Sequence, residues 1–441
     1  MSLPRYPEYK DSGVEWLGTV PAHWDAWKIR HAFGKVGSGT TPPSDASEWY
    51  LGGTIPWVTT GELRETVVKE TAKYITQAAV EKFSALRLHP KGSLAIAMYG
   101  ATIGRLGILG VDATTNQACC VLSSPQELTV RFVFYWLLGF KQQIIDLYAS
   151  GGGQPNISQE TISSLRIPAP NMEEQAAIAT FLDHETGKID ALIAEQEKLI
   201  ALLAEKRQAT ISHAVTKGLN PDVPMKDSGV AWLGEVPAHW AVKKMKWVAE
   251  MESGHTPDKK VPAYWDEGDI PWVSLNDTGF LKDNDYISET AYNVTQQGIE
   301  NSSARLLPPR VVVFSRDATI GRCAITTRPM AVSQHFIAWV CGDSIVPEYL
   351  LLRLRSMTQE LDRLTSGATL KTIGMPDVRT LVTPVPPLEE QRAIIDFISS
   401  ASEKLDALSA EAQCAAELLK ERRVALISAA VTGKIDVRKA A

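Results

Sequence analysis

The residues best suited to chemistry lie in two matching turns that carry an arginine. The sequence Ala-Thr-Ile-Gly-Arg occupies residues 101–105 and returns at residues 318–322, each time between two short apolar runs that predict a β-hairpin. A guanidinium group can form two hydrogen bonds to guanine or pair with a phosphate, so Arg105 and Arg322 are candidate nucleic-acid contacts. A solvated Gly-Arg turn without a ligand explains the same residues equally well.

Other small, polar turns could donate hydrogen bonds to phosphates. Thr40 and Thr256 lie in or beside the matching turns Ser-Gly-Thr at residues 38–40 and Ser-Gly-His at residues 253–255. Gln154 and Lys371 end the polar loops 150–154 and 366–371. The two turns could equally serve only to reverse the chain, and the two loops could be plain linkers into the segments that follow.

Motifs for catalysis are missing from the sequence. It has no GxxxxGK[ST] phosphate loop, no glycine-rich strand-to-helix turn, no Asn-Pro-Pro-aromatic or Asp-Pro-Pro-aromatic box, and no HExxH or CxxC metal pattern. Cys119 and Cys120 end a predicted strand and are expected to fill the core. His23 and His239 occupy matching Ala-His-Trp steps, which favours packing against tryptophan over two active sites. We therefore expect no catalytic residue, metal or cofactor in this chain.

The composition is that of an ordinary globular protein of about three domains. Its 441 residues are 44% hydrophobic and 22% charged, with no secretory signal and no apolar run of membrane-spanning length. The five cysteines lack disulfide spacing, which predicts a reducing cytoplasm. The net charge of −6 argues against nucleic-acid binding. Residues 303–379 nevertheless hold 10 bases and 6 acids, which could form a basic face or be ordinary surface charge.

An internal duplication organises the whole chain. Lys-Asp-Ser-Gly-Val-x-Trp-Leu-Gly at residues 10–18 returns at 226–234, and Ile-Pro-Trp-Val at 55–58 returns at 270–273. The offset between matching positions stays within 215 to 217. The chain is therefore expected to be two tandem halves with internal pseudo-two-fold symmetry, each a globular block followed by a long helix.

The globular blocks are expected to be mixed α/β, of the α+β class. Residues 93–98 with 107–111, and residues 310–314 with 323–327, predict two equivalent hairpins, and residues 130–147 and 347–364 carry helical spacing. The halves differ most in the middle of each block, at residues 59–90 and 274–308.

Two long helices are the clearest prediction. Apolar residues from Ile178 to Leu203 recur with a heptad spacing, and the same ladder returns from Ile394 to Leu419. Prolines precede each helix, Glu-Glu pairs occupy each first turn, and a glycine follows each last turn. We expect the two helices to pair with one another, and the residues alone allow either a parallel or an antiparallel orientation. The predicted segments are residues 1–170, 171–219, 220–386 and 387–441.

These motifs resemble the DNA-specificity subunit of a type I restriction–modification system over nearly the whole chain. The resemblance rests on Asp-Ser-Gly-Val-x-Trp-Leu-Gly-x-Val-Pro-x-His-Trp at residues 11–24 and 227–240, Ile-Pro-Trp-Val, Glu-Glu-Gln at 173–175 and 389–391, and Ala-Val-Thr at 214–216 and 430–432. It implies two target-recognition domains, each reading half of a split DNA site, with the helices paired antiparallel as a spacer. It implies no catalysis here. Two modification subunits would bring S-adenosylmethionine, and two restriction subunits would bring ATP and Mg.

The resemblance directs the search for base-reading residues to the segments that differ between the halves. The candidates are Arg64, Arg87 and Lys91 in the first block and Asn276, Arg305 and Arg310 in the second. Polar residues at the helix starts and within the ladders are candidates for docking partner subunits; these are Glu174, Gln175, Glu185, Gln196, Glu390 and Gln391.

Two other functions are compatible with the residues alone. A coiled-coil scaffold with two protein-binding domains and no DNA role would explain the acidic balance. A self-contained nuclease or methyltransferase is disfavoured by the missing motifs.

Overall fold

The structure is a computed structural model that describes residues 4–151, 154–367 and 371–439. Contacts divide the chain into two compact units, Met1–Glu197 with Gln413–Ala441, and Lys198–Ala412. The units divide the chain differently from the four predicted segments, because each unit takes one half of each long helix. Residues 152–153 and 368–370 of the two predicted polar loops lie outside the described residues.

The globular part of the first unit, residues 4–171, is here called the first domain. Its central sheet has the order β4-β11-β8-β9-β6, antiparallel except for the parallel pair β6 and β9. The strands of this sheet are β4 (Phe33–Ser38), β6 (Thr66–Val68), β8 (Leu94–Ala97), β9 (Leu106–Leu109) and β11 (Cys119–Pro125). A smaller sheet has the order β10-β5-β7. The remaining strands are β1 (Tyr9–Asp11), β2 (Thr19–Pro21), β3 (Asp25–Lys28), β5 (Ile55–Val58), β7 (Tyr74–Ile75), β10 (Thr114–Thr115) and β12 (Arg166–Ala169).

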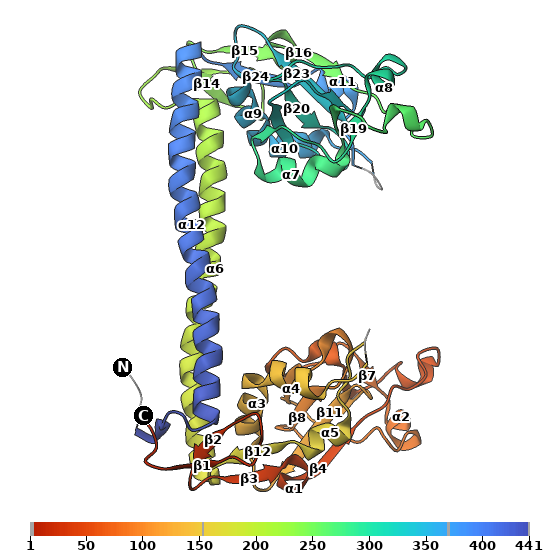
Figure 1. The fold of residues 1–441 in the computed structure, drawn as a ribbon, viewed down its shortest axis with the longest axis vertical. Helices are drawn as coiled ribbons and strands as arrows, with labels where there is room; N and C mark the ends of the chain where they lie inside the picture. Colours follow the sequence, from red (N-terminus) through yellow and green to blue (C-terminus); the bar gives the residue numbers. More distant parts are fainter. Residues whose placement is uncertain (1–3, 152–153, 368–370, 440–441) are drawn as a thin grey trace. The chain divides into compact units, whose positions relative to one another are not determined.

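Short helices pack around the sheets of the first domain (Figure 1). They are α1 (Ile29–Ala32), α2 (Gln77–Lys82), α3 (Val130–Gly139), α4 (Lys141–Tyr148) and α5 (Gln159–Ser164), with 3-10 turns η1 (Ser47–Trp49), η2 (Thr60–Glu62) and η3 (Gly100–Thr102). The hairpin β8–β9 and the helical stretch after β11 confirm two sequence predictions. That stretch is two helices, because it breaks at Phe140. Cys119 and Cys120 are fully buried, as expected of core residues.

The second domain, residues 218–387, repeats this topology. Its central sheet has the order β16-β23-β20-β21-β18, and its smaller sheet is β19-β17-β22. The strands are β13 (Met225–Asp227), β14 (Glu235–Pro237), β15 (Ala241–Lys244), β16 (Ala249–Ser253), β17 (Ile270–Val273), β18 (Tyr286–Ile287), β19 (Asn293–Val294), β20 (Val312–Ser315), β21 (Cys323–Thr326), β22 (Ala331–Val332), β23 (Phe336–Cys341) and β24 (Val382–Val385). The helices are α7 (Thr278–Asp283), α8 (Gln296–Glu300), α9 (Pro347–Ser356), α10 (Thr358–Leu364) and α11 (Met375–Val378). The 3-10 turns are η4 (Met245–Trp247), η5 (Pro262–Tyr264) and η6 (Leu275–Asp277), and η7 (Val437–Lys439) follows the last helix of the chain.

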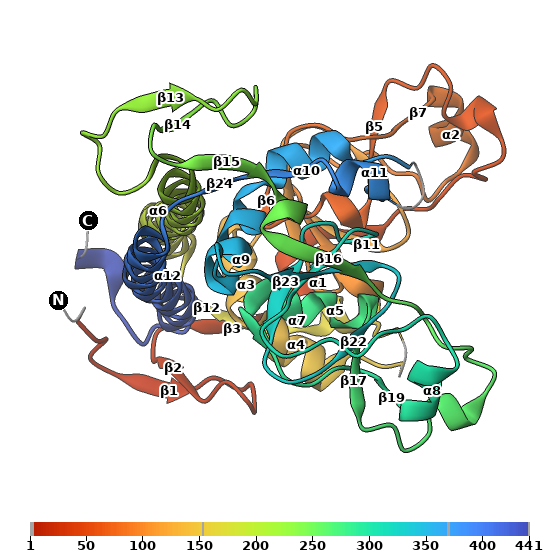
Figure 2. The same cartoon turned by 90° about the horizontal axis from the view of Figure 1, so that it is seen from above.

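The two long helices are α6 (Met172–Lys217) and α12 (Leu388–Val431). In each unit a segment of α6 lies alongside a segment of α12 (Figures 1 and 2). In the first unit, Asp190 of α6 pairs with Arg423 of α12 at 2.7 Å; in the second, Arg207 pairs with Asp406 at 3.0 Å. Early residues of α6 thus meet late residues of α12, and the reverse, which confirms the predicted antiparallel pairing.

Both helices contribute to the core of each unit. In the first unit, Ile178 of α6 and Ile427 of α12 lie in one apolar cluster with Trp24 and Phe132 of the first domain. Burying these side chains holds the domain on both helices at once.

The predicted heptad ladder is wrong at three leucines. Its spacing predicts Leu192, Leu199 and Leu408 in the seam, but they are 50%, 42% and 50% exposed. An α-helix has 3.6 residues per turn, so a heptad stripe drifts by about 20° per repeat around a straight helix. These leucines therefore face outward, while Leu203 and Leu405 of the same ladders are buried.

Candidate nucleic-acid interface

A short turn, two strands and a glutamine form one edge of the first domain. At Gly39, a Cβ atom would lie 1.7 Å from a main-chain carbonyl oxygen of β10, so no larger residue fits there. The turn that follows is held by two hydrogen bonds. The indole of Trp57 donates to the carbonyl of Thr40 at 3.1 Å, and the hydroxyl of Thr41 donates to Oε1 of Gln117 at 2.6 Å. The side chain of Gln117 is exposed.

The second domain repeats this arrangement. A Cβ atom at Gly254 would lie 1.6 Å from a carbonyl oxygen of β22. The indole of Trp272 donates to the carbonyl of His255 at 3.1 Å, and the hydroxyl of Thr256 donates to Oε1 of Gln334. Gln334 is exposed, like its counterpart. We call each set of threonine, glutamine and tryptophan the Thr–Gln site.

Matching capping boxes anchor the segments that follow the Thr–Gln sites. Thr59 and Glu62 form one in the first domain, and Ser274 and Asp277 form the other in the second. Each acidic side chain also accepts a main-chain N–H from further along the chain at 2.7 Å. The segments that differ most between the halves are therefore fixed to the same frame.

A cavity of about 500 Å³ opens beside the Thr–Gln site of the second domain. Its lining is aromatic and polar, and includes Thr256, Lys259, Trp265, Trp272, Ser274, Leu275, Asn276, Tyr292, Ser333, Gln334 and His335. The aromatic rim differs between the domains. The N–H of Trp272 donates to the carbonyl of Tyr292 at 3.1 Å, as the N–H of Trp57 donates to the carbonyl of Lys73 at 3.1 Å. A tyrosine in one domain therefore stands where the other places a lysine, 5.9 Å above the Trp57 ring.

Beside the Thr–Gln sites, main-chain hydrogen bonds identify further equivalent positions with unlike side chains. The N–H of Met98 donates to the carbonyl of Ala118 at 2.8 Å, and the N–H of Arg316 donates to the carbonyl of His335 at 3.0 Å. An apolar pair in the first domain thus corresponds to a basic pair in the second.

The neighbouring positions differ in the same way. Tyr99 forms an isolated bridge with Asn156, and Asp317 forms one with Thr372. Burial raises the pKa of Tyr99. Asp317, whose side chain is only 7% exposed, accepts hydrogen bonds from the hydroxyl of Thr372 and from Nδ1 of His335, the latter at 2.7 Å.

The offset of 217 predicted for the Ala-Thr-Ile-Gly-Arg turns holds at Gly104 and Gly321 but not where the turns begin. Gly100 has φ +75° and Ala318 has φ +60°, and the carbonyls of Pro155 and Lys371 accept their respective N–H groups. The turn in the second domain is therefore one residue shorter.

Some predicted DNA contacts gather near the Thr–Gln sites. Thr256 and Asn276 line the same cavity, and Lys371 lies next to Thr372 in the network around Asp317. In the first domain, Thr40 belongs to the site through its carbonyl, and the exposed Gln154 precedes the segment that bridges to Tyr99.

Other predicted contacts lie apart from these sites. Arg64, Arg87 and Lys91 are exposed on the first domain, and Arg105 is half-buried in its hairpin turn. In the second domain, two of the predicted arginines form salt bridges and the third lines a cavity. Arg305 pairs with Glu252, Arg310 pairs with Glu348 at 2.8 Å, and Arg322 lines a separate cavity of about 310 Å³.

The Glu-Glu-Gln motifs, expected to dock partners, instead join each helix to its domain. Gln175 and Gln391 are fully buried, and each uses its amide for three hydrogen bonds to main-chain groups. Glu174 is buried and lies 2.9 Å from Nε2 of His23; Glu390 lies 2.9 Å from Nε2 of His239. This corrects the expectation for Glu174, Gln175 and Gln391, because their polar atoms face the interior.

The partly exposed candidates have local roles as well. Glu390 also accepts from the indole of Trp240 at 2.5 Å, which supports a structural role for the repeated Ala-His-Trp steps. Glu185 pairs with Lys188 at 2.8 Å, a contact that lowers the pKa of this carboxyl. Gln196 is half-buried on α6.

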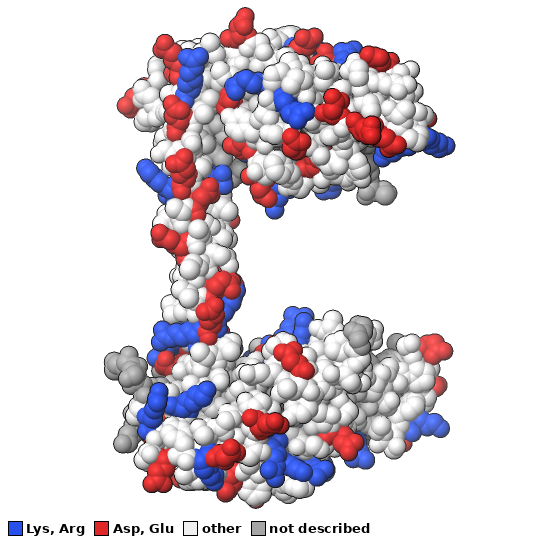
Figure 3. Space-filling view, viewed as in Figure 1, with Lys and Arg blue, Asp and Glu red and all other residues white. Residues whose placement is uncertain are grey.

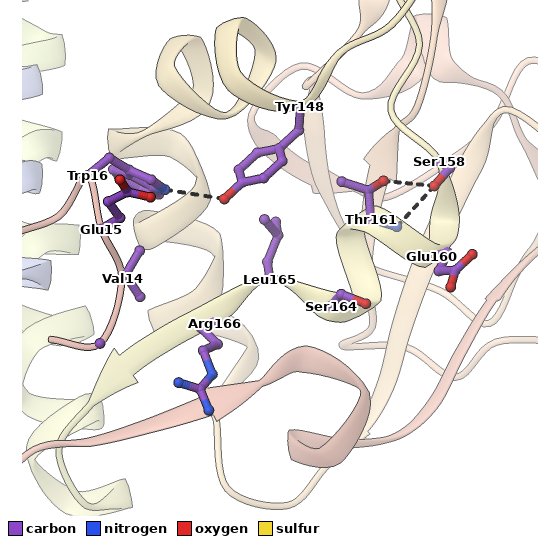
Figure 4. A pocket seen from close by; sticks show the side chains of 11 residues that line it. Val14, Glu15, Trp16, Tyr148, Ser158, Glu160, Thr161, Ser164, Leu165 and Arg166 are labelled. Carbon is purple, nitrogen blue, oxygen red and sulfur yellow. Dashed lines mark hydrogen bonds between the residues drawn. The ribbon is translucent and has the colours of Figure 1, made fainter.

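A second cavity of about 500 Å³ lies in the first domain between the tip of the β1–β2 hairpin and α5 (Figure 4). Trp16 at the hairpin tip donates through its indole to the hydroxyl of Tyr148 at 3.4 Å. Across the cavity, the hydroxyls of Ser158 and Thr161 bond to one another at the start of α5. The Trp16–Tyr148 hydrogen bond joins the hairpin to the domain and Ser158 caps α5, so we assign these polar groups a structural role.

Surface charge is mixed on the face shown in Figure 3. Lysine and arginine are interspersed with aspartate and glutamate on both domains there. Among the described residues, no group of three or more His, Cys, Asp or Glu side chains could hold a metal ion. Of the described helices, none is long and apolar enough to cross a membrane.

Comparisons with known proteins place these features in a family. A sequence model of the type I restriction modification DNA specificity domain matches residues 24–201 and again residues 237–415. The specificity subunit of the type I restriction enzyme MjaVIII from Methanocaldococcus jannaschii is 23% identical over 423 residues, which cover 95% of this chain and 94% of that protein. The EcoR124I/EcoR124II specificity subunit from Escherichia coli is 28% identical over 161 residues, 36% of this chain and 40% of that protein.

Solved structures share the fold. The HsdS subunit from Thermoanaerobacter tengcongensis is 17% identical, with a TM-score of 0.54 over 94% of this chain and 98% of that one. A chain from a structural study of the assembly and conformational transition of the type I R-M system is also 17% identical, with a TM-score of 0.68 over 94% of this chain and 99% of that one. With two matches to the domain model that span most of its length, this chain belongs to the family of type I restriction–modification DNA specificity proteins.

Proposed function

We propose that this chain is the DNA-reading subunit of a type I restriction–modification enzyme, and that each domain reads one half of a bipartite, asymmetric site in double-stranded DNA. The observation that carries the proposal is the pair of Thr–Gln sites. The frame is kept in both domains, down to the glycine and the indole hydrogen bond, while the side chains around it differ.

Two related domains that bind different DNA sequences should share the same backbone structure and differ in the side chains around it. The backbone must approach DNA in the same way, because duplex geometry is shared by every sequence. The base edges differ, so the side chains that meet them must differ too. The varied side chains, here called the rim, are Met98, Tyr99 and Ala118 in the first domain. Their counterparts in the second domain are Arg316, Asp317 and His335. Family membership supports this function over a scaffold without a DNA role.

The chain itself is proposed to be non-catalytic. Methyl transfer from S-adenosylmethionine and ATP-driven cleavage with Mg are assigned to modification and restriction subunits. Because its ligand is DNA, we place the complex in the cytoplasm.

The long helices are the proposed docking surface for modification subunits. α6 exposes Leu192 and Leu202, and α12 exposes Leu408 and Leu418 at matching positions of the repeat. Large exposed apolar side chains on a helix favour burial against a partner. Because the same pair occurs once on each helix, we propose that two copies of one partner bind.

The test exchanges one domain. The chain is purified with its modification subunits, and its preferred site is selected from a pool of randomised duplexes. Replacing residues 1–165 with those of a relative of different specificity should change one half-site and leave the other intact. A change in both half-sites would contradict independent reading, and the absence of any selected sequence would contradict the proposed function itself.

A further inference from the structure

We propose that Gln117 and Gln334 each read an adenine, one in each half of the DNA site, through hydrogen bonds to its N6 amino group and N7. This inference rests on the proposed function. It names the residue and the base at one position of each half-site, and it assigns residues that lie outside the predicted contacts.

In the second domain, a series of hydrogen bonds fixes the orientation of the Gln334 amide. The carboxylate of Asp317 accepts from Nδ1 of His335 at 2.7 Å, so this nitrogen carries the hydrogen. In the tautomer with its hydrogen on Nδ1, Nε2 is an acceptor. This nitrogen lies 3.3 Å from Nε2 of Gln334, so the NH₂ group of the amide faces it. The amide oxygen therefore faces the opposite side, where the hydroxyl of Thr256 donates to it.

The exposed amide keeps one donor and one acceptor for a ligand. Its NH₂ group has two hydrogens and uses one for His335; its oxygen has two lone pairs and uses one for Thr256. In the major groove, adenine offers one acceptor at N7 beside one donor at N6, and a glutamine amide satisfies both. Guanine offers two acceptors at the same edge, so the amide oxygen would face another oxygen without a hydrogen between them.

The first domain presents the same amide without the histidine. The hydroxyl of Thr41 donates to Oε1 of Gln117 at 2.6 Å, which turns the NH₂ group outward. Ala118 stands where the second domain has His335, so one hydrogen bond orients this amide instead of two. The glutamine amide is thus present in both domains, while the residues around it differ.

Matched readers in a duplicated frame imply a shared base. Both glutamines follow the same short parallel pairing, β10 with β5 and β22 with β17, and both lie next to a turn whose glycine cannot be replaced. If the two domains approach DNA alike, the two amides meet equivalent positions of their half-sites. The half-sites should then share an adenine at that position and differ around it.

The test uses the full chain bound to its modification subunits. Sites are selected from randomised duplexes by wild type, Gln117→Ala and Gln334→Ala. Each variant should lose preference for adenine at one position of one half-site, with discrimination falling about 5- to 150-fold, the range of a bidentate base contact. Matched controls are Gln143→Ala and Gln359→Ala, which remove exposed glutamines outside the segments that differ between the halves.

A probe of single atoms separates base reading from a structural role. Placing 7-deazaadenine at the assigned position of the wild-type site removes N7 alone. Wild type should bind this duplex more weakly, whereas Gln334→Ala should bind it as well as the natural duplex. A merely structural glutamine would leave wild type indifferent to the substitution.

The outcomes distinguish this inference from the proposed function. If wild type selects a bipartite site but neither variant changes any position, the adenine assignment is overturned and the proposed function stands. If wild type selects no sequence, the proposed function fails first. Loss of binding with an unchanged melting temperature and preserved preference at every position would also contradict the assignment.

Discussion

Truncation of the buried glutamines at the helix starts should destabilise the domains that they hold. In the second domain, Oε1 of Gln391 accepts from the N–H of Val346 at 2.9 Å, and its Nε2 donates to the carbonyls of Ser344 and Pro386 at 2.8 and 2.9 Å. Gln391→Ala removes all three hydrogen bonds and leaves those main-chain groups without their partner.

The magnitude follows from the buried groups that lose a partner. Each unsatisfied buried donor or acceptor costs about 1–3 kcal/mol; one of the three bonds is buried and two are partly buried, so their loss should lower the free energy of unfolding by about 3–5 kcal/mol in total. A domain of this size is stable by only about 5–15 kcal/mol. At about 2–4 °C per kcal/mol, the melting temperature should fall by about 10 °C.

The assay is thermal unfolding of the full chain followed by circular dichroism. Gln175→Ala is the matched variant, because this residue makes the equivalent three bonds in the first domain. Gln413→Ala on the surface of α12 is the control and should change stability by less than about 0.5 kcal/mol. If Gln391→Ala melts at the wild-type temperature but no longer binds the modification subunits, this reasoning is refuted. That result would support the docking role expected from the sequence.

Three further predictions concern single residues. Arg353 is 1% exposed, two of its nitrogens have no partner among the described residues, and burial lowers its pKa to about 10. Arg353→Met should therefore raise the free energy of unfolding by about 1–2 kcal/mol despite losing the contact with Trp232 and the hydrogen bond to Ser356; a lower melting temperature would contradict this. Gly254→Ala should destabilise by about 3 kcal/mol, because its Cβ would overlap the carbonyl of Val332, and wild-type stability would show that the turn is not tight. At pH 8 a thiol reagent should label only Cys414 in the folded chain, because burial raises the pKa of the other four thiols to about 11 or 12. After denaturation the reagent should label all five cysteines. Cys414→Ser should abolish the labelling of the folded chain.

Local pattern was enough to predict the duplication, the hairpins and the two long helices, whereas the antiparallel orientation of the helices was implied only by the family resemblance. These features depend on residues close in sequence or repeated at a constant offset. The prediction that Leu192 lies in the seam was wrong, because the burial of this residue depends on how the helix packs against its partner. The Glu-Glu-Gln motif was misread for a related reason. A polar residue after a helix start looks exposed, and only the fold reveals that a domain loop covers Gln175.

The Thr–Gln sites could not be assembled from sequence because their parts come from distant segments. Thr41 and Gln117 are 76 positions apart and meet only through the pairing of β4 with β11. The clue was present, since a glutamine recurs at residues 117 and 334 with unlike neighbours. Because arginine makes the commonest specific contacts to bases, the sequence pattern pointed to the hairpin turns instead.

The varied rim has a consequence for how specificity can change. Asp317 is nearly buried and depends on His335 and Thr372 for its hydrogen bonds. An aspartate placed alone at Tyr99 would lack both partners, because Ala118 and Asn156 occupy the equivalent positions, and a half-buried carboxylate without these donors is destabilising. Members of such a network stabilise one another, so they can be exchanged only together. Specificity in this chain should therefore move in whole sets of rim residues, while the glycine, threonine, glutamine and tryptophan of the frame stay in place.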